Sequence, residues 1–192
     1  GTIVDWFLAK GFDASIKKLK ENVVDATIHI YNAIAATLLP TPAKSHYLFN
    51  LRDLSKVFQG VAQGSSDVIQ EKSQFVRLWS HECLRVFYDR LINEGDRDWF
   101  IETLKEVTKG SFNLDWSQVQ ENPDKPVVFG NYSNPRAIKK VYQEIDDMEI
   151  LSKVMNDYLD DYNAVSNKPM DLVLFQNAID HVSKISRVIN QP

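Results

Sequence analysis

The chain has little cysteine and no long hydrophobic run. Its 192 residues include one cysteine, Cys83, which excludes an intramolecular disulfide and suits a reducing compartment. No apolar stretch approaches the roughly 18 residues that span a bilayer, and no secretory signal is recognised. The net charge is -4 and the pI is near 5.6, so basic residues are not in excess. We therefore expect neither nucleic acid nor a membrane as a partner.

The sequence also lacks the motifs of a self-sufficient enzyme. It contains no Gly-x-x-x-x-Gly-Lys-Ser/Thr loop for phosphate and no apolar strand that ends in paired acidic residues. The run from His81 to Arg85 is similar to a zinc-binding helix, but Arg85 stands where the second histidine would be. The acidic residues between positions 146 and 161 lack the spacing of a calcium loop. We therefore predict no catalytic residue and no metal ligand.

The remaining reactive side chains fit structural roles. Cys83 lies on the apolar face of a predicted helix, where cysteine behaves as a small hydrophobic residue. Three histidines are far apart in the sequence and have no nucleophile motif beside them: His29, His46 and His181. Arg85 and Arg90 are typical of structural ion-pair residues.

Helical periodicity dominates the chain. Apolar residues recur at helical spacing over residues 13–39 with a break near Glu21 and Asn22, then over 67–93, 96–108, 147–165 and 171–190. The second of these ranges would form a helix of about 40 Å at 1.5 Å per residue. Residues 127–129 are the best strand candidate, and residues 47–49 are the only plausible partner. The prediction is a mostly α fold with at most one short β-strand pair.

A further helix is expected to begin after Asn50, and it carries the most informative residue, Arg52. Asn50 is a favourable N-cap, and Asp53 places an acidic side chain at the positive end of the helix. An arginine in the first turn is unfavourable against the helix dipole unless it binds an anion. Arg52 therefore has two possible roles: it contacts a phosphate held by a neighbouring domain, or it pairs with Asp53, Glu82 or Asp89.

At these residues the sequence resembles dynein heavy chains. Residues 39–54 (LPTPAKSHYLFNLRDL) resemble the start of the helical lid of the third AAA+ module, and residues 78–91 (LWSHECLRVFYDRL) resemble the long helix of that lid. Three shorter segments follow in the expected order: VFGNY at 128–132, MDLVLF at 170–175 and SKISRVINQP at 183–192. The resemblance covers nearly the whole chain. The Asn-Leu-Arg-Asp form of residues 50–53 is similar to axonemal heavy chains, and within them to the inner-arm type.

The resemblance implies a helical AAA+ lid-type bundle from a six-module ATPase ring that moves on microtubules. Residues 1–45 would be a helical segment that joins the upstream core to the lid, residues 46–165 the lid, and residues 166–192 a connector helix leading into the next module. Arg52 matches the lid arginine called sensor 2, which reaches the terminal phosphates of the nucleotide. The phosphate-binding and metal-binding parts would lie before Gly1 and after Pro192, so this piece would not hydrolyse ATP alone.

The resemblance also implies partners and a location. The partners would be neighbouring AAA+ modules of the same heavy chain, with the microtubule and other dynein subunits reached through the parent protein. ATP or ADP with Mg²⁺ would be cofactors of the parent and not of this piece. The location would be cytoplasmic and cytoskeletal, in the ciliary or flagellar axoneme.

Two alternatives stay open at this point. The first is a helical interaction or scaffold module with no nucleotide role, and the more distant one is an unrecognised enzyme. Burial of Arg52 against an acidic residue of its own chain would favour the scaffold, whereas an exposed guanidinium would favour the lid. A pocket that joins His46 or His81 to a carboxylate would indicate the enzyme.

Overall fold

The structure is a computed structural model that describes residues 2–120, 122 and 127–190. It divides into two compact units, residues 1–126 and residues 127–192. The described residues form nine α-helices, two short 3-10 helices and one two-stranded sheet. The predicted mostly α fold with one short strand pair is therefore confirmed. None of the helices in the described part is both long enough and apolar enough to cross a bilayer.

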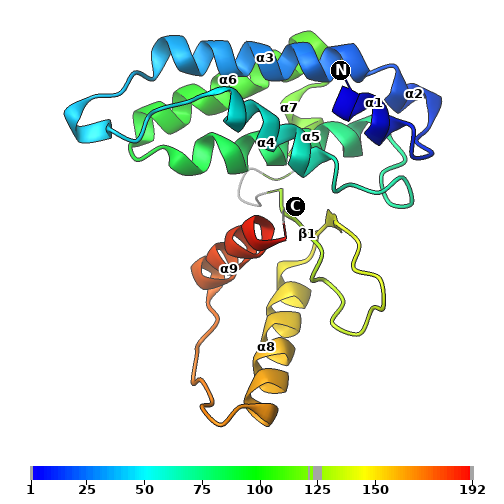
Figure 1. Cartoon of the computed structure of the whole chain (residues 1–192), viewed down its shortest axis with the longest axis vertical. Coiled ribbons are helices and arrows are strands. Elements are labelled where there is room, and N and C mark those ends of the chain that lie inside the picture. Colours follow the sequence, from blue (N-terminus) through cyan, green and yellow to red (C-terminus); the bar gives the residue numbers. More distant parts are fainter. Residues whose placement is uncertain (1, 121, 123–126, 191–192) are drawn as a thin grey trace. The chain divides into compact units, whose positions relative to one another are not determined.

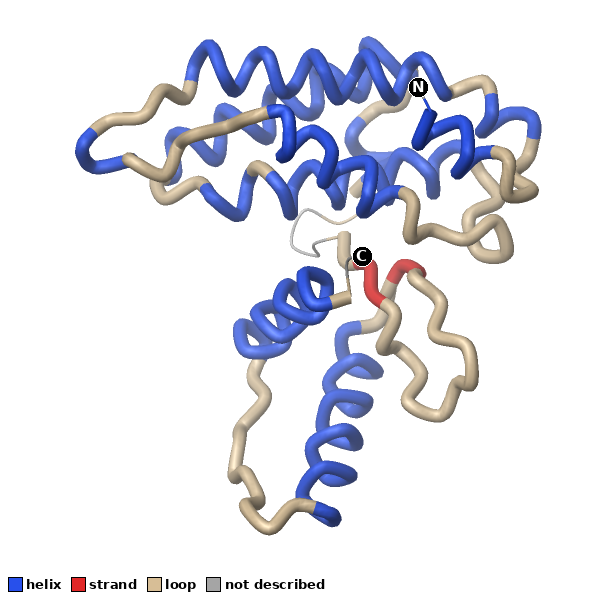
Figure 2. Tube along the Cα trace, viewed as in Figure 1, coloured by secondary structure: helices blue, strands red, loops and turns tan. Residues whose placement is uncertain are grey.

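The first unit is a bundle of helices (Figure 1). In chain order it contains α1 (Thr2–Leu8), α2 (Ala14–Lys17), α3 (Lys20–Thr37), η1 (Pro42–Lys44), α4 (Leu51–Val61), α5 (Lys72–Val86), η2 (Tyr88–Arg90), α6 (Glu94–Phe112) and α7 (Trp116–Val119). Helix α3 packs against α6 and α4, and α5 packs against α4, α6 and α7. Figure 2 shows that the chain between α3 and α4 is loop apart from η1.

The core of the first unit is centred on Trp79 of α5. Its side chain is fully buried, and its indole N–H donates a hydrogen bond of 2.9 Å to the hydroxyl of Thr27 on α3. The Thr27 hydroxyl in turn donates to the carbonyl of Val23 at 2.6 Å. The rings of Trp79 and Phe112, the last residue of α6, pack edge-to-face with their centroids 5.0 Å apart. One side chain thus joins three helices and has its polar atom satisfied.

Helix α5 is shorter than the periodicity predicts, so the helix expected over residues 67–93 is wrong at both ends. It begins after Glu71, because Gln74 accepts the backbone N–H of Glu71 at 3.1 Å and closes a capping box. It ends at Val86, where the backbone turns into the 3-10 helix η2. The 15 residues of α5 span about 23 Å, not about 40 Å.

Helices α2, α3 and α6 also differ in extent from the sequence prediction. The range 13–39 is divided between Lys17 and Lys20, somewhat before the expected break near Glu21. Helix α6 runs four residues beyond the predicted end at Thr108 and ends at Phe112; the next residue, Asn113, caps it with a left-handed φ of 51°. Helix α7 lies outside the helical ranges that the periodicity predicts.

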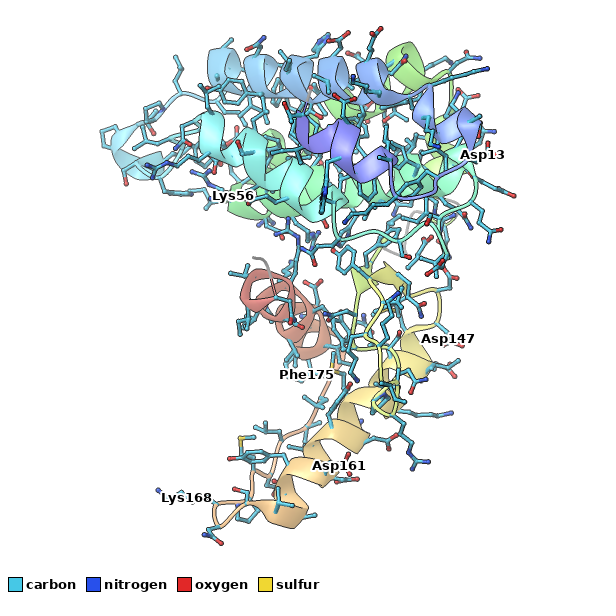
Figure 3. The ribbon with its side chains drawn as sticks, turned by 45° about the vertical axis from the view of Figure 1, so that its right-hand side comes forward. Asp13, Lys56, Asp147, Asp161, Lys168 and Phe175 are labelled. Carbon is cyan, nitrogen blue, oxygen red and sulfur yellow. The ribbon has the colours of Figure 1, made fainter. Side chains whose placement is uncertain are left out.

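The second unit contains β1 (Phe129–Gly130), β2 (Gln143–Glu144), α8 (Met148–Val165) and α9 (Gln176–Ile189). Its buried cluster consists of Val128, Tyr132, Ile145, Leu151, Met155 and Ile179. Asp147 caps α8 by accepting the N–H groups of Glu149 and Ile150, and Figure 3 labels it at one end of this helix. Helix α9 starts after Phe175, so the predicted start at Asp171 is wrong.

The strand pair has a different partner from the one predicted. Strand β1 pairs antiparallel with β2, with Phe129 opposite Glu144 and Gly130 opposite Gln143. Residues 47–49 form no strand. The backbone carbonyls of Leu48 and of His46, just before this segment, instead accept hydrogen bonds from the guanidinium of Arg90. The predicted pairing of residues 127–129 with residues 47–49 is therefore wrong.

The boundary between the two units lies at residues 126 and 127, whereas the sequence-based division was placed at residues 45 and 165. Residues before 45 belong with the first unit because α3 packs against α4 and α6. Residues after 165 belong with the second unit because α9 packs against α8 and β1. The assignment of an entering segment, a lid and a connector stays a prediction.

Candidate functional site

The candidate site is built on the first turn of α4, which starts as the sequence predicts. Asn50 has an extended backbone, and its side-chain oxygen accepts the backbone N–H of Arg52 at 2.8 Å. The carboxylate of Asp53 accepts the backbone N–H of Asn50 at 3.0 Å, which completes a capping box. The position of Arg52 on the protein is therefore determined by hydrogen bonds at the N-terminus of the helix.

The side chain of Arg52 is exposed. Within the described part of the chain its guanidinium makes no ion pair, and the three acidic residues considered as partners have other neighbours. Asp53 binds Lys56 at 3.2 Å and Arg90 at 3.0 Å. Asp89 lies 3.3 Å from Arg85, and Glu82 is buried inside the unit. Arg52 therefore adds a positive charge to a helix end that is already positive, an arrangement that attracts anions.

A second arginine, Arg90 of η2, lies against the same helix start. Its guanidinium donates to the carboxylate of Asp53 at 3.0 Å and to the backbone carbonyls of His46 at 2.8 Å and Leu48 at 3.1 Å. It also lies over the ring of Phe49, 4.5 Å from the ring centroid. The predicted structural ion-pair role of Arg90 is confirmed, but its reach to the loop before α4 was not predicted.

The carboxylate of Asp53 is held in its charged form. Its burial alone would raise the pKa of Asp53, but the hydrogen bonds from the Asn50 amide and Lys56 and the charge of Arg90 hold this pKa below its ordinary value. Figure 3 labels Lys56 on α4, one turn beyond Arg52. The Asp53 carboxylate thus completes the helix cap and also binds Arg90 of η2.

A second set of contacts holds the loop upstream of the cap. Tyr47 is buried, and its hydroxyl donates to Asp96 of α6 at 2.8 Å while accepting the N–H of Ile92 at 3.1 Å. Lys44 binds the same carboxylate at 2.6 Å. Burial raises the pKa of Tyr47, and the hydrogen bonds from Lys44 and Tyr47 outweigh burial in lowering the pKa of Asp96. The loop before α4 is therefore anchored on α6 as well as on η2.

Comparison with known proteins decides the family. Residues 23–120, about half of the chain, match the family model described as the AAA+ lid domain. The chain belongs to the AAA+ lid domain family. The matched residues run from the first turn of α3 to the end of α7, so they include the loop, the capped helix α4 and the arginine of η2.

Axonemal dynein heavy chains are similar to this lid over nearly its whole length. Dynein axonemal heavy chain 3 of Mus musculus is 42% identical over 200 residues, which cover 99% of the chain and 5% of the mouse protein. Dynein axonemal heavy chain 6 of Homo sapiens is 44% identical over 98% of the chain and 4% of the human protein. Dynein axonemal heavy chain 2 of Mus musculus is 40% identical over the full chain. The chain thus spans about one twentieth of the length of these relatives.

The reactive side chains of α5 are not open to solvent. Cys83 is fully buried, and burial together with the charge of Glu82 raises the pKa of its thiol well above the ordinary value. His81 lies 3.9 Å from the Glu82 carboxylate, but both side chains are buried, with Glu82 against Gly60 of α4. Among the described residues no three His, Cys, Asp or Glu side chains are grouped to hold a metal ion.

A cavity of about 370 Å³ lies in the second unit. Its lining includes Lys140, whose ammonium group donates to the hydroxyl of Tyr158 at 3.1 Å. The described residues of the lining include neither a histidine nor a carboxylate. The described lining therefore does not contain the pairing of His46 or His81 with a carboxylate that would indicate the enzyme alternative.

Proposed function

We propose that this chain is the lid and connector of an AAA+ module in an axonemal dynein heavy chain, and that Arg52 contacts the terminal phosphates of a nucleotide held by a neighbouring core. The exposed guanidinium of Arg52, in the first turn of a capped helix and without a carboxylate partner in the described part of the chain, carries this proposal. Membership of the AAA+ lid family and the similarity to axonemal dynein heavy chains support it.

The chemistry of the site fits a polyphosphate. A guanidinium offers several N–H donors in a planar fork that matches phosphate oxygens, and the free N–H groups of a helix start add positive potential. The Asn50 cap satisfies part of this helix end and sets where Arg52 leaves the backbone. The nucleotide would supply the terminal phosphate, and this chain would supply a positive contact to it.

The role is regulatory and not catalytic. An arginine alone does not position a phosphate, a metal ion and an attacking water, and the printed sequence contains no phosphate-binding loop. We assign the lid to the third module of the ring, with Mg²⁺ and the phosphate-binding loop supplied by the core of that module. Contact between Arg52 and the phosphate would couple the position of the lid to the state of the nucleotide, and this movement would pass round the ring to the microtubule-binding part of the motor. The place of action is the ciliary or flagellar axoneme.

The scaffold alternative rests on a different part of the chain. Helix α9 exposes Ile185, Val188 and Ile189, with 58%, 65% and 75% of these side chains accessible. Apolar residues of this kind are typical of contacts with another protein part. They suit a connector equally well, and the exposed position of Arg52 favours the lid.

The proposal is tested by Arg52→Ala in the full-length heavy chain, with the phosphate-binding loops of the other modules disabled so that one nucleotide site is read. Loss of a charge-assisted contact should weaken binding of a fluorescent ATP analogue by about tenfold or more. Arg52→Lys should recover part of the loss, because lysine keeps the charge but not the fork. Lys105→Ala, which removes a cation paired with Glu102 on α6, is the matched control. Unchanged nucleotide affinity in Arg52→Ala would overturn the proposal.

A further inference from the structure

Arg90 makes contacts on both sides of the helix cap that presents Arg52. The two carbonyls that it binds, those of His46 and Leu48, precede Asn50 in the chain. The carboxylate that it binds, that of Asp53, follows Asn50 by three residues. A single guanidinium therefore bridges the loop that enters α4 and the first turn of α4.

The contact is reciprocal. The imidazole Nε2 of His46 lies 3.0 Å from the carbonyl oxygen of Arg90, so the backbone of η2 also contacts the loop. The ring of Phe49 lies against the face of the Arg90 guanidinium. Three acceptors and a ring face are a combination that the planar fork of arginine can satisfy and the single ammonium group of lysine cannot.

Other contacts besides this bridge hold the loop and the helix start. The loop is also held by Tyr47 and Lys44 on Asp96, and the helix start by the Asn50 capping box. Arg90 itself is partly accessible, with 30% of its side chain exposed, so its loss opens no cavity in the core. The bridge is thus placed to set the direction of the helix start, and the remaining contacts should keep the unit folded without it.

From this geometry we propose that Arg90 is a positioning residue for Arg52: it holds the first turn of α4 against η2 so that the Arg52 guanidinium meets the phosphate. The inference rests on the proposed function of Arg52 and adds to it a second arginine that acts without touching the nucleotide. Small displacements of a contacting group weaken a directional interaction strongly. Loss of Arg90 should therefore reduce the contribution of Arg52 to nucleotide binding.

The test is a double-mutant cycle in the same full-length heavy chain, read by binding of the fluorescent ATP analogue. Arg90→Ala should weaken binding by about tenfold when Arg52 is present. In the Arg52→Ala background the same change should have almost no further effect, because the interaction through which Arg90 acts is gone. A purely structural role would produce the same loss in both backgrounds, and that result, or an unchanged affinity in Arg90→Ala, would overturn the inference.

Two further variants complete the design. Arg97→Ala is the matched control, since its guanidinium also binds a backbone carbonyl, that of Leu91 at 2.9 Å, and lies over the ring of Tyr88 but does not contact residues 46–53. It should leave the affinity unchanged. Arg90→Lys keeps a charge near Asp53 without the fork, and it should weaken binding less than Arg90→Ala and only when Arg52 is present. If Arg90→Ala fails to fold, the lysine variant decides the outcome by the same cycle.

Failure of the inference and failure of the proposed function are distinguishable. If Arg52→Ala alone leaves nucleotide affinity unchanged, Arg52 is not a phosphate contact and the proposed function fails. The positioning role alone fails in two cases, both with Arg52→Ala weakening binding. In the first, Arg90→Ala leaves the affinity unchanged. In the second, Arg90→Ala weakens binding by the same factor whether Arg52 is present or replaced by alanine.

Discussion

The carboxylate of Asp53 lies 3.0 Å from the guanidinium of Arg90, which is 37 residues further along the chain. Asp53 also closes the capping box of α4, so one buried side chain satisfies a helix end and an ion pair. The neighbouring Arg52 is exposed. The acid that could have neutralised Arg52 is thus bound to Arg90 and Lys56.

Replacing Asp53 by Asn should destabilise the chain at neutral pH. Asparagine can still accept the Asn50 N–H, but it loses the charge that faces Arg90 and Lys56, so we expect a loss of about 2 kcal/mol in the free energy of unfolding. Urea unfolding at pH 7 measures it. Asp25→Asn on the exposed face of α3 is the control and should change the free energy by less than about 0.5 kcal/mol.

The same variant predicts a pH dependence with a definite sign. The pKa of Asp53 is lower in the folded chain than in the unfolded chain, where it is about 3.9. Its contribution to stability is therefore complete above about pH 4 and is lost as the pH falls through the lowered folded pKa. The difference between wild type and Asp53→Asn should shrink in that acidic range. A constant difference from pH 7 down to pH 3 would contradict the assignment.

Gly60→Ala should destabilise the contact between α4 and α5. A Cβ atom at this position would lie 1.7 Å from a carboxylate oxygen of Glu82 and 2.9 Å from its Cγ, and Glu82 is fully buried. Overpacking of about 1–3 kcal/mol should exceed the gain of about 1 kcal/mol in helix propensity. Thermal and urea unfolding both measure the net effect.

Gly110→Ala is the matched control for this change. Gly110 also lies within a helix, α6, but a Cβ there would meet nothing within 4 Å beyond its chain neighbours and its own helix backbone. Only the propensity gain applies, so this variant should be more stable than wild type by up to about 1 kcal/mol. Equal effects of the two alanines would show that Glu82 does not restrict Gly60.

The sequence predicts the start of α4 but not the contacts of Arg90 that hold it, and the reason is physical. The cap of Asn50 and Asp53 involves residues three positions apart, so the sequence alone predicts it. The partner of Asp53 depends on how α4 and η2 meet in space. No local pattern marks Arg90 as that partner rather than as an ordinary helix residue, and the sequence suggested only an ion pair of unknown geometry.

The end of α5 illustrates a second limit. Phe87 and Leu91 continue the apolar pattern of the helix and are buried, as a longer helix would require. The chain nevertheless leaves the α conformation at Val86, and the 3-10 turn that follows places Arg90 against the loop. Hydrophobic periodicity reports which residues are buried, and it does not distinguish a continuing helix from a tight turn that buries the same side chains.

The prediction of the strand partner failed for a related reason. The strand was predicted over residues 127–129 from their β-branched and aromatic side chains, but β1 covers Phe129–Gly130, so the prediction is right only at Phe129. Its partner, Gln143–Glu144, carries no such signal. A pairing between residues 13 or more positions apart leaves no local signal in a partner that lacks strand propensity.

Trp79→Phe should be strongly destabilising. The change removes the hydrogen bond to Thr27 and part of the contact with Phe112, and it leaves unfilled volume in a fully buried position. We expect a loss of about 2–4 kcal/mol in the free energy of unfolding. Trp6→Phe is the control: Trp6 is 59% exposed and lies under Lys10, so its loss should cost less than about 1 kcal/mol. Similar losses for the two tryptophans would contradict the central position of Trp79.

Cys83 provides a direct measure of unfolding. Its thiol is fully buried and has a raised pKa, so little reactive thiolate exists and reagents have no access to the sulfur in the folded chain. The reaction with a thiol-specific chromogenic reagent should therefore follow the unfolded fraction as urea is added, and one equivalent should react in the unfolded chain. Cys83→Ala should abolish the signal, which identifies its source. Rapid stoichiometric labelling without denaturant would contradict the buried position and would reopen a reactive role for this cysteine.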